Sequence, residues 1–475
     1  MPALSDALDG EVDVYTVDHR GTGRSHLLKC DAAQAFTTGS PGGSSIDYRE
    51  VPNCIKDILF QIDGHTSAFS ITSAAKDMEL LIQTLNKGQE AYVYGASYGT
   101  YLTSRLMHLA PNTVKGYILD GVWSESIGTF AHFLSHRDEP GKYLASLCEK
   151  NEVCKSKYAY DLEQHGDLFN AWRATYDKLD AAAPGENPCA DLFRSDTSLF
   201  PSQVLRLLLN QELNPGETVK RRLIPAFFRM AARCSGDDLK KLQVLMGLPA
   251  DKTLSQMLKE GMFKITPFDE LREFSFFLMY LIKASEMWTY PSPSWADEKK
   301  TIQSGVFAMD ASTDYDWYCL VNGDLKDPSC AGLLAGGEPF RLVNASGIQP
   351  VKFMYERDQY YRKVAAVPSH ASVMVMNGKL DFQTIHSWAE DEYEKLVGRK
   401  ILVEFDFGPH CIAIGPTTPD DQTQCGMRIL TSYVAVGGDV DKVDVSCMNE
   451  LPDIDFDVEE EMTAMAEATG ENGSK

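Results

Sequence analysis

The stretch that most constrains the fold is residues 91–111, AYVYGASYGTYLTSRLMHLAP. Its apolar opening predicts a buried strand, and the apolar spacing after Gly99 predicts a helix. Between them, the Gly-x-Ser-x-Gly pattern of residues 95–99 predicts a sharp turn, because glycines let the strand and the helix approach closely. A strand that passes directly into a helix is typical of a parallel sheet with crossover helices.

The same turn predicts a chemical role for Ser97. A serine in a strained strand-to-helix turn presents its hydroxyl to solvent, which suits a nucleophile. The alternative is that Ser97 is only a small residue in a tight turn. A nucleophilic serine needs a histidine base, and the base needs a carboxylate that holds its tautomer. The rest of the chain must therefore supply both partners.

Asp381 and His410 fit these two roles. Each directly follows an apolar run, at the carboxyl end of a predicted strand, and the order Ser, Asp, His matches this architecture. Two rivals exist, because Asp120 ends the strand after the turn and His386 lies inside a helical pattern. The alternatives for the favoured pair are a helix N-cap at Asp381 and an ordinary surface histidine at His410.

The alternation of short β-rich and helical runs predicts an α/β fold with a mostly parallel sheet. From residue 11 to 123 we expect strands at 12–21, 91–97 and 114–122, separated by a helix at 73–86 and the helix after Ser97. After residue 370 we expect strands at 372–381 and 400–410 and helices at 384–398 and 425–438. The predicted core therefore comprises residues 1–124 and 351–452.

The middle of the chain has a different pattern. Residues 125–350 contain long amphipathic stretches and few β-rich runs, which predicts a mainly helical cap inserted into the core. Residues 453–475 are rich in Asp and Glu without periodicity, which predicts a disordered acidic tail.

The charge of the chain excludes some partners. Its formal net charge is −23, and a field of that sign repels nucleic-acid backbones and anionic membranes. No window reaches the ~18 apolar residues of a membrane-spanning helix. No phosphate-binding loop and no metal-ligand spacing is present, so we expect no cofactor and no metal.

The 11 cysteines suggest an exported protein. None has CxxC spacing, which argues against a zinc ribbon or a redox site. Local spacing predicts disulfides at 148–154, 319–330 and 425–447, with 30–54 and 189–234 as looser pairings and Cys411 left over. The alternative is a set of buried thiols in a cytosolic protein. The Asn344–Ser346 glycosylation sequon agrees with export.

Three segments carry a resemblance to a known family. They are VDHRGTGRS (17–25), GASYG (95–99) and NGKLDFQTIHSWA (377–389), in which Ile385 replaces a usual proline. The chain resembles the α/β-hydrolase-fold serine peptidases related to prolyl iminopeptidase, especially the secreted tripeptidyl-aminopeptidase-like branch. The paired cysteines near the C-terminus are similar to that branch too.

The resemblance implies roles for specific residues. Ser97 would be the nucleophile, Asp381 the orienting acid and His410 the general base, with the backbone N–H of Tyr98 in the oxyanion hole. The helical cap would restrict the site to peptide ends. Glu286 is a candidate for binding the ammonium of a peptide substrate, although a helix-surface glutamate is the alternative.

The resemblance also predicts a hydrolase that cleaves peptides near a free N-terminus through an acyl-enzyme. The alternatives are an esterase or lipase, because the same three residues serve both reactions, and a non-catalytic relative. The family's His-Gly-Gly-Pro-Gly-like oxyanion loop has no counterpart before residue 18, and the chain opens without a signal peptide. We therefore expect an N-terminally truncated form of a secreted parent.

Overall fold

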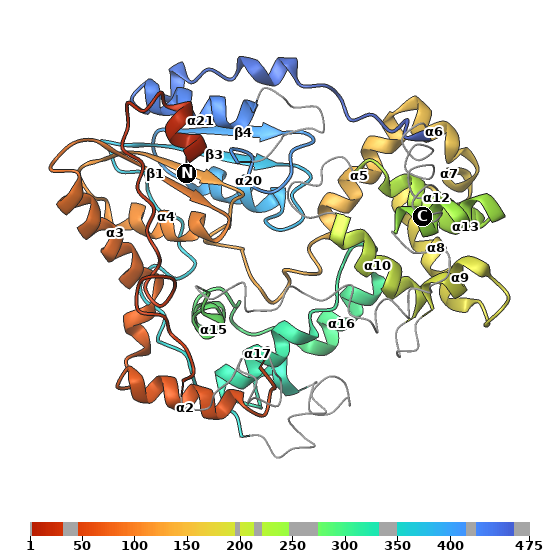
Figure 1. Ribbon diagram of the computed structural model, residues 1–475, viewed down its shortest axis with the longest axis horizontal. Coiled ribbons are helices and arrows are strands. Elements are labelled where there is room, and N and C mark those ends of the chain that lie inside the picture. Colours follow the sequence, from red (N-terminus) through yellow and green to blue (C-terminus); the bar gives the residue numbers. More distant parts are fainter. Residues whose placement is uncertain are drawn as a thin grey trace, which may run out of the picture.

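A four-stranded parallel sheet forms the centre of the α/β core (Figure 1). The computed structural model describes residues 2–31, 46–194, 200–212, 221–246, 274–331, 349–414 and 424–459. The strands occur in the order β1-β2-β3-β4 and are β1 (Ala91–Ala96), β2 (Val114–Asp120), β3 (Ser372–Gly378) and β4 (Lys400–Phe405). The long segment that was predicted to be a cap therefore connects β2 and β3, the two middle strands of the sheet.

Helices cover both faces of the sheet because its strands alternate between two apolar clusters. In β3, Val373 and Val375 pack toward one face, and Met374 and Met376 pack toward the other. The first face is covered by α3 (Ile71–Leu85), α4 (Tyr98–Leu109) and α20 (His386–Lys395), and the second by α21 (Cys425–Ala435) and α1 (Pro2–Ala7). Burial on both faces explains why β3 is apolar throughout.

The register brings the carboxyl ends of the strands together. Ala96 pairs with Asp120, and Asp120 pairs with Met376. On the other side of β3, Gly378 pairs with Phe405. The residues that follow each strand therefore emerge at one edge of the sheet, where ligands bind in open α/β folds.

The predicted strand at residues 12–21 is wrong. This segment is extended but pairs with no strand of the described chain, and Tyr15 and Val17 are about half exposed. A strand is completed by hydrogen bonds to a neighbour. Alternating apolar and polar residues do not form a strand when no neighbouring strand pairs with them, and this segment has none among the described residues.

In the described part of the chain between β2 and β3, helices alternate with irregular segments, and no named strand occurs. Its helices are α5 (Asp138–Lys150), α6 (Glu152–Lys157), α7 (Ala159–His165), α8 (Leu168–Ala181), α9 (Pro188–Phe193), α10 (Pro201–Glu212), α12 (Ile224–Arg233), α13 (Gly236–Leu245), α15 (Phe276–Ser285), α16 (Trp295–Ser304) and α17 (Ser312–Asn322). Helices α5 to α13 share one apolar cluster, whereas α15 to α17 pack with α2 (Val51–Gln61) in another. The exact boundaries of core and cap stay predictions.

The first residues of the acidic C-terminal segment are packed, in contrast to the predicted disordered tail. Ile454, Phe456 and Val458 are buried among the cap helices, and Asp457 pairs with Lys157 at 3.7 Å. In Figure 1 this segment runs from α21 to α6 across the molecule. The apolar residues recur at every second position, so the acidic residues between them stay in solvent.

Five disulfides are present, and they are the five predicted pairs: 30–54, 148–154, 189–234, 319–330 and 425–447. Cys411 is the free, buried cysteine of the described chain. The sequon at Asn344 lies outside the described residues. In the part of the chain that the structure describes, no helix has the length and apolarity needed to cross a membrane.

A close backbone contact at the end of β3 gives a test of this packing. A Cβ on Gly378 would lie 2.0 Å from the carbonyl oxygen of Gly408. We expect Gly378→Ala to lower the free energy of unfolding by about 3 kcal/mol, because backbone must move to relieve the overlap. Gly236→Ala is the control, since no atom lies within 4 Å of its added Cβ. Equal denaturation midpoints for the two variants would contradict this packing.

Candidate active site

Ser97 occupies a strained turn between β1 and α4. Its φ of 55° and ψ of −124° lie outside the regions that non-glycine residues favour. A Cβ on Gly95 would lie 2.3 Å from the carbonyl oxygen of Gly99, so strand and helix approach too closely for a larger residue. The local geometry is that of a nucleophile elbow.

His410 and Asp381 form a buried hydrogen-bonded pair. Nδ1 of His410 lies 2.8 Å from Oδ2 of Asp381, and Asp381 is fully buried. The other carboxylate oxygen accepts hydrogen bonds from the backbone N–H groups of Gln383, at 2.8 Å, and Thr384, at 2.9 Å. These bonds fix the carboxylate in a turn that precedes α20, so Asp381 is not the N-cap of that helix, which is Ile385.

The hydrogen bond to Asp381 sets the protonation of His410. Because the carboxylate accepts from Nδ1, the neutral ring has its free lone pair on Nε2. Burial opposes the charged imidazolium and lowers the pKa of His410. The charge and hydrogen bond of Asp381, together with the charge of Asp120, act in the opposite direction, and the pKa is raised above its usual value. The ring lies over Gly121, where an added Cβ would be 3.0 Å from Nδ1.

Asp120, at the end of β2, holds the two halves of the site together. Its backbone carbonyl accepts from the N–H of Ser97 at 2.9 Å. Its carboxylate accepts from the N–H groups of Ile412, at 2.7 Å, and Ala413, at 2.9 Å. The hydroxyl of Tyr94 donates a further bond at 2.8 Å. One residue thus connects the elbow to the loop that carries His410.

Burial raises the pKa of Asp120 to about 6, although its N–H donors, Tyr94 and His410 act in the opposite direction. Asp120 makes no hydrogen bond to the His410 ring among the described contacts. This rival for the orienting acid is therefore an anchor of the loop, and Asp381 is the carboxylate that contacts the ring.

The structure brings Ser97 and His410 to the same edge of the sheet. The thiol of Cys411, the residue after His410, lies 3.8 Å from the backbone carbonyl oxygen of Asp120. The same carbonyl accepts the hydrogen bond from the N–H of Ser97. Within the described chain no hydrogen bond joins the Ser97 hydroxyl to His410. In unliganded sites such bonds are often long, and they tighten when substrate binds.

Tyr98 is the first residue of α4, where backbone N–H groups have no acceptor within the helix. Such an N–H suits an anionic oxygen beside Ser97, and the oxyanion-hole role of Tyr98 stays a prediction. The Tyr98 hydroxyl lies 3.2 Å from Nε2 of His19, whose Nδ1 bonds the Arg20 carbonyl at 2.7 Å. The 17–25 segment is thereby fixed against the elbow.

Glu286 is buried and paired inside the protein, so the helix-surface interpretation is wrong. Its carboxylate lies 2.7 Å from Arg105, and it accepts bonds from Tyr355, at 2.7 Å, and the N–H of Ile71, at 3.2 Å. These partners occupy both oxygens. The structure therefore offers no support for Glu286 as the residue that binds a substrate ammonium.

Sequence reasoning missed two residues of the site. Thr384 donates its hydroxyl to Oδ2 of Asp381 at 2.8 Å and lies 3.1 Å from Nδ1 of His410. Gly121 supplies the space beneath the imidazole ring. Thr384 lies in the quoted 377–389 motif, which was the available signal, whereas Gly121 follows a strand without any distinctive pattern.

Comparison with known proteins agrees with this architecture. Residues 1–146 match the family model described as alpha/beta hydrolase fold. The chain thus contains an α/β-hydrolase domain, and the predicted fold class is confirmed. The match includes Ser97, whereas Asp381 and His410 lie beyond it. No curated protein matches the sequence. This fold points to a hydrolase without naming a substrate.

Removal of the Asp120 charge should shift the titration of His410. We expect Asp120→Asn to lower the pKa of His410, because the imidazolium loses a nearby negative charge that stabilises it. Histidine NMR of the folded variant measures this shift. The exposed Asp441→Asn serves as the control and should leave that pKa in place. An unchanged or raised pKa in Asp120→Asn would contradict the electrostatic coupling.

Proposed function

We propose that this chain is a serine hydrolase in which Ser97 is the nucleophile, His410 the general base and Asp381 the acid that orients it. The observation that carries the proposal is the bond from His410 Nδ1 to Asp381 at 2.8 Å, together with the strained φ of Ser97. A buried carboxylate on Nδ1 leaves Nε2 ready to accept a proton, which is what a serine nucleophile requires.

The reaction follows from these positions. The Ser97 hydroxyl adds to the substrate carbonyl as its proton passes to Nε2 of His410. The Tyr98 N–H stabilises the oxyanion, and the imidazolium then protonates the leaving group as the carbonyl re-forms in an acyl-enzyme. Water, deprotonated by His410, releases the acyl group and restores Ser97.

Peptides are the substrate class that we favour, with cleavage near a free N-terminus. The support is the resemblance of the 17–25, 95–99 and 377–389 segments to the prolyl iminopeptidase-related peptidases, and the helical insertion between β2 and β3. We also propose that the protein acts outside the cell, as the secreted branch of that family does. Five disulfides agree with an oxidising compartment.

Labelling with a fluorophosphonate probe tests the nucleophile. We expect the folded chain to be labelled and Ser97→Ala to lose all labelling, because only an activated serine reacts with the probe. The exposed Ser156→Ala should keep full labelling. If soluble, folded protein is not labelled at all, the result would support the second candidate, a non-catalytic relative. The observation that favours this candidate is that no hydrogen bond joins Ser97 to His410 among the described contacts.

Paired substrates separate a peptidase from an esterase of the same fold. We expect hydrolysis of aminoacyl nitroanilides, and a loss on the order of 100-fold or more when the substrate amine is acetylated, because a site that binds an ammonium rejects a neutral amide. The measurement is kcat/KM for each matched pair. Activity confined to acyl nitrophenyl esters would overturn the peptidase assignment and support an esterase.

A further inference from the structure

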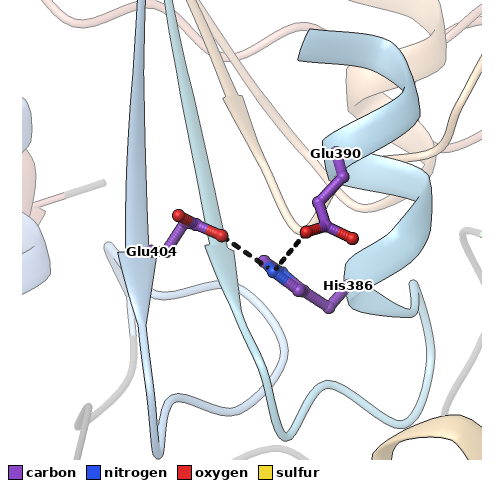
Figure 2. A group of neighbouring side chains, drawn as sticks. All are labelled: His386, Glu390 and Glu404. Atoms are coloured by element: carbon purple, nitrogen blue, oxygen red, sulfur yellow. Dashed lines mark ion pairs between the residues drawn. The ribbon is translucent and has the colours of Figure 1, made fainter. Parts of the chain in front are cut away.

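Three side chains outside the site converge where α20 lies against β4. His386 and Glu390 are one turn apart on α20, and Glu404 projects from β4 (Figure 2). Nε2 of His386 lies 2.8 Å from Glu404 Oε1 and 3.6 Å from Glu390 Oε1. One ligand-type atom from each residue lies within 4.8 Å of the other two.

We propose that these three residues form a binding site for a divalent transition-metal ion of the Zn²⁺ class. Zinc bonds to imidazole and carboxylate are about 2.0–2.2 Å long, so ligand atoms at tetrahedral angles are roughly 3.4 Å apart. The distances from His386 Nε2 to the Glu404 and Glu390 oxygens are 2.8 Å and 3.6 Å, one below and one above that value. Three protein ligands leave a fourth position for water. A mixed nitrogen and oxygen donor set favours such ions over Ca²⁺ and Mg²⁺, which prefer oxygen alone.

The charges around the cluster favour a cation. Two carboxylates face one imidazole. Lys379, a cation near Glu404, forms an ion pair with Asp406 at 2.7 Å. Glu390 is 55% exposed, so an ion can enter from solvent. The two carboxylates give the cluster a negative charge that a divalent ion would neutralise.

The histidine sets the expected strength of the site. When Nε2 binds a metal, the ring proton must reside on Nδ1. Nδ1 of His386 is buried and has no hydrogen-bond partner among the residues that the structure describes. Metal-bound histidines normally donate this proton to an acceptor, and the loss of such a partner weakens binding roughly 10–100-fold. We therefore expect weaker binding than at a four-ligand structural zinc site, by roughly 10–100-fold for the absent acceptor alone.

The position of the site suggests a structural role. His386 follows Asp381 by five positions, and Glu404 precedes His410 by six. A bound ion would connect the two segments that carry these residues. This inference does not depend on the proposed hydrolase activity, since it rests on a different group of side chains.

Calorimetry with ZnCl₂ on the EDTA-dialysed, tag-free full chain tests the site. We expect binding of one ion per chain and a higher Tm with Zn²⁺. Glu390→Gln and Glu404→Gln should each weaken binding at least roughly tenfold. Glu394→Gln, an exposed residue on the same helix, is the matched control and should bind as the unaltered chain does.

Co²⁺ absorption provides a readout of the donor set. We expect visible bands of a nitrogen- and oxygen-coordinated ion, which the two glutamate variants abolish or weaken. A sulfur charge-transfer band would assign the ion to Cys411 and overturn the proposal. The proposal is also overturned if Zn²⁺ shows no saturable binding up to about 1 mM. Normal Zn²⁺ binding by both glutamate variants, or Ca²⁺ binding as tight as that of Zn²⁺, would overturn it as well.

Discussion

The geometry of the candidate active site depends on the end of β2, where Asp120 contacts both halves of the site. Its carbonyl fixes the N–H of Ser97, and its carboxylate fixes the N–H groups of Ile412 and Ala413. A buried carboxylate is costly unless donors surround it, and here two amides and a tyrosine hydroxyl do so. Because Asp120 lies on a middle strand, the sheet itself fixes the positions of Ser97 and of the loop that carries His410.

A second buried interaction joins the elbow helix to the cap. Arg105 on α4 and Glu286 at the end of α15 form an ion pair at 2.7 Å, with both side chains almost fully buried. Such pairs add little net stability, but removal of one partner leaves an uncompensated charge and costs about 3–5 kcal/mol. The helix that begins beside Ser97 is thereby held against a cap helix, and Glu286 is unavailable to substrate.

Much of the fold could be predicted from the sequence because its signals are local. Strands β1 to β4 and helices α3, α20 and α21 lie where periodicity placed them. The five disulfides follow the spacing of the cysteines. The segment at 12–21 was mispredicted because a strand is completed by hydrogen bonds to a neighbouring strand, and the segment itself does not encode that neighbour. Ile454, Phe456 and Val458 were missed because the acidic residues between them concealed an alternating apolar face.

By itself, the sequence determined the strained turn at Ser97 and the order of Ser97, Asp381 and His410 along the chain. These are properties of neighbouring residues and of strand ends, which composition and spacing encode. The tertiary structure alone decided that Asp381, and not Asp120, contacts the His410 ring, that Thr384 supports this contact, and that Glu286 faces Arg105. Each of these outcomes depends on strand register and on the packing of the cap against α4, which bring together residues that are distant in the chain.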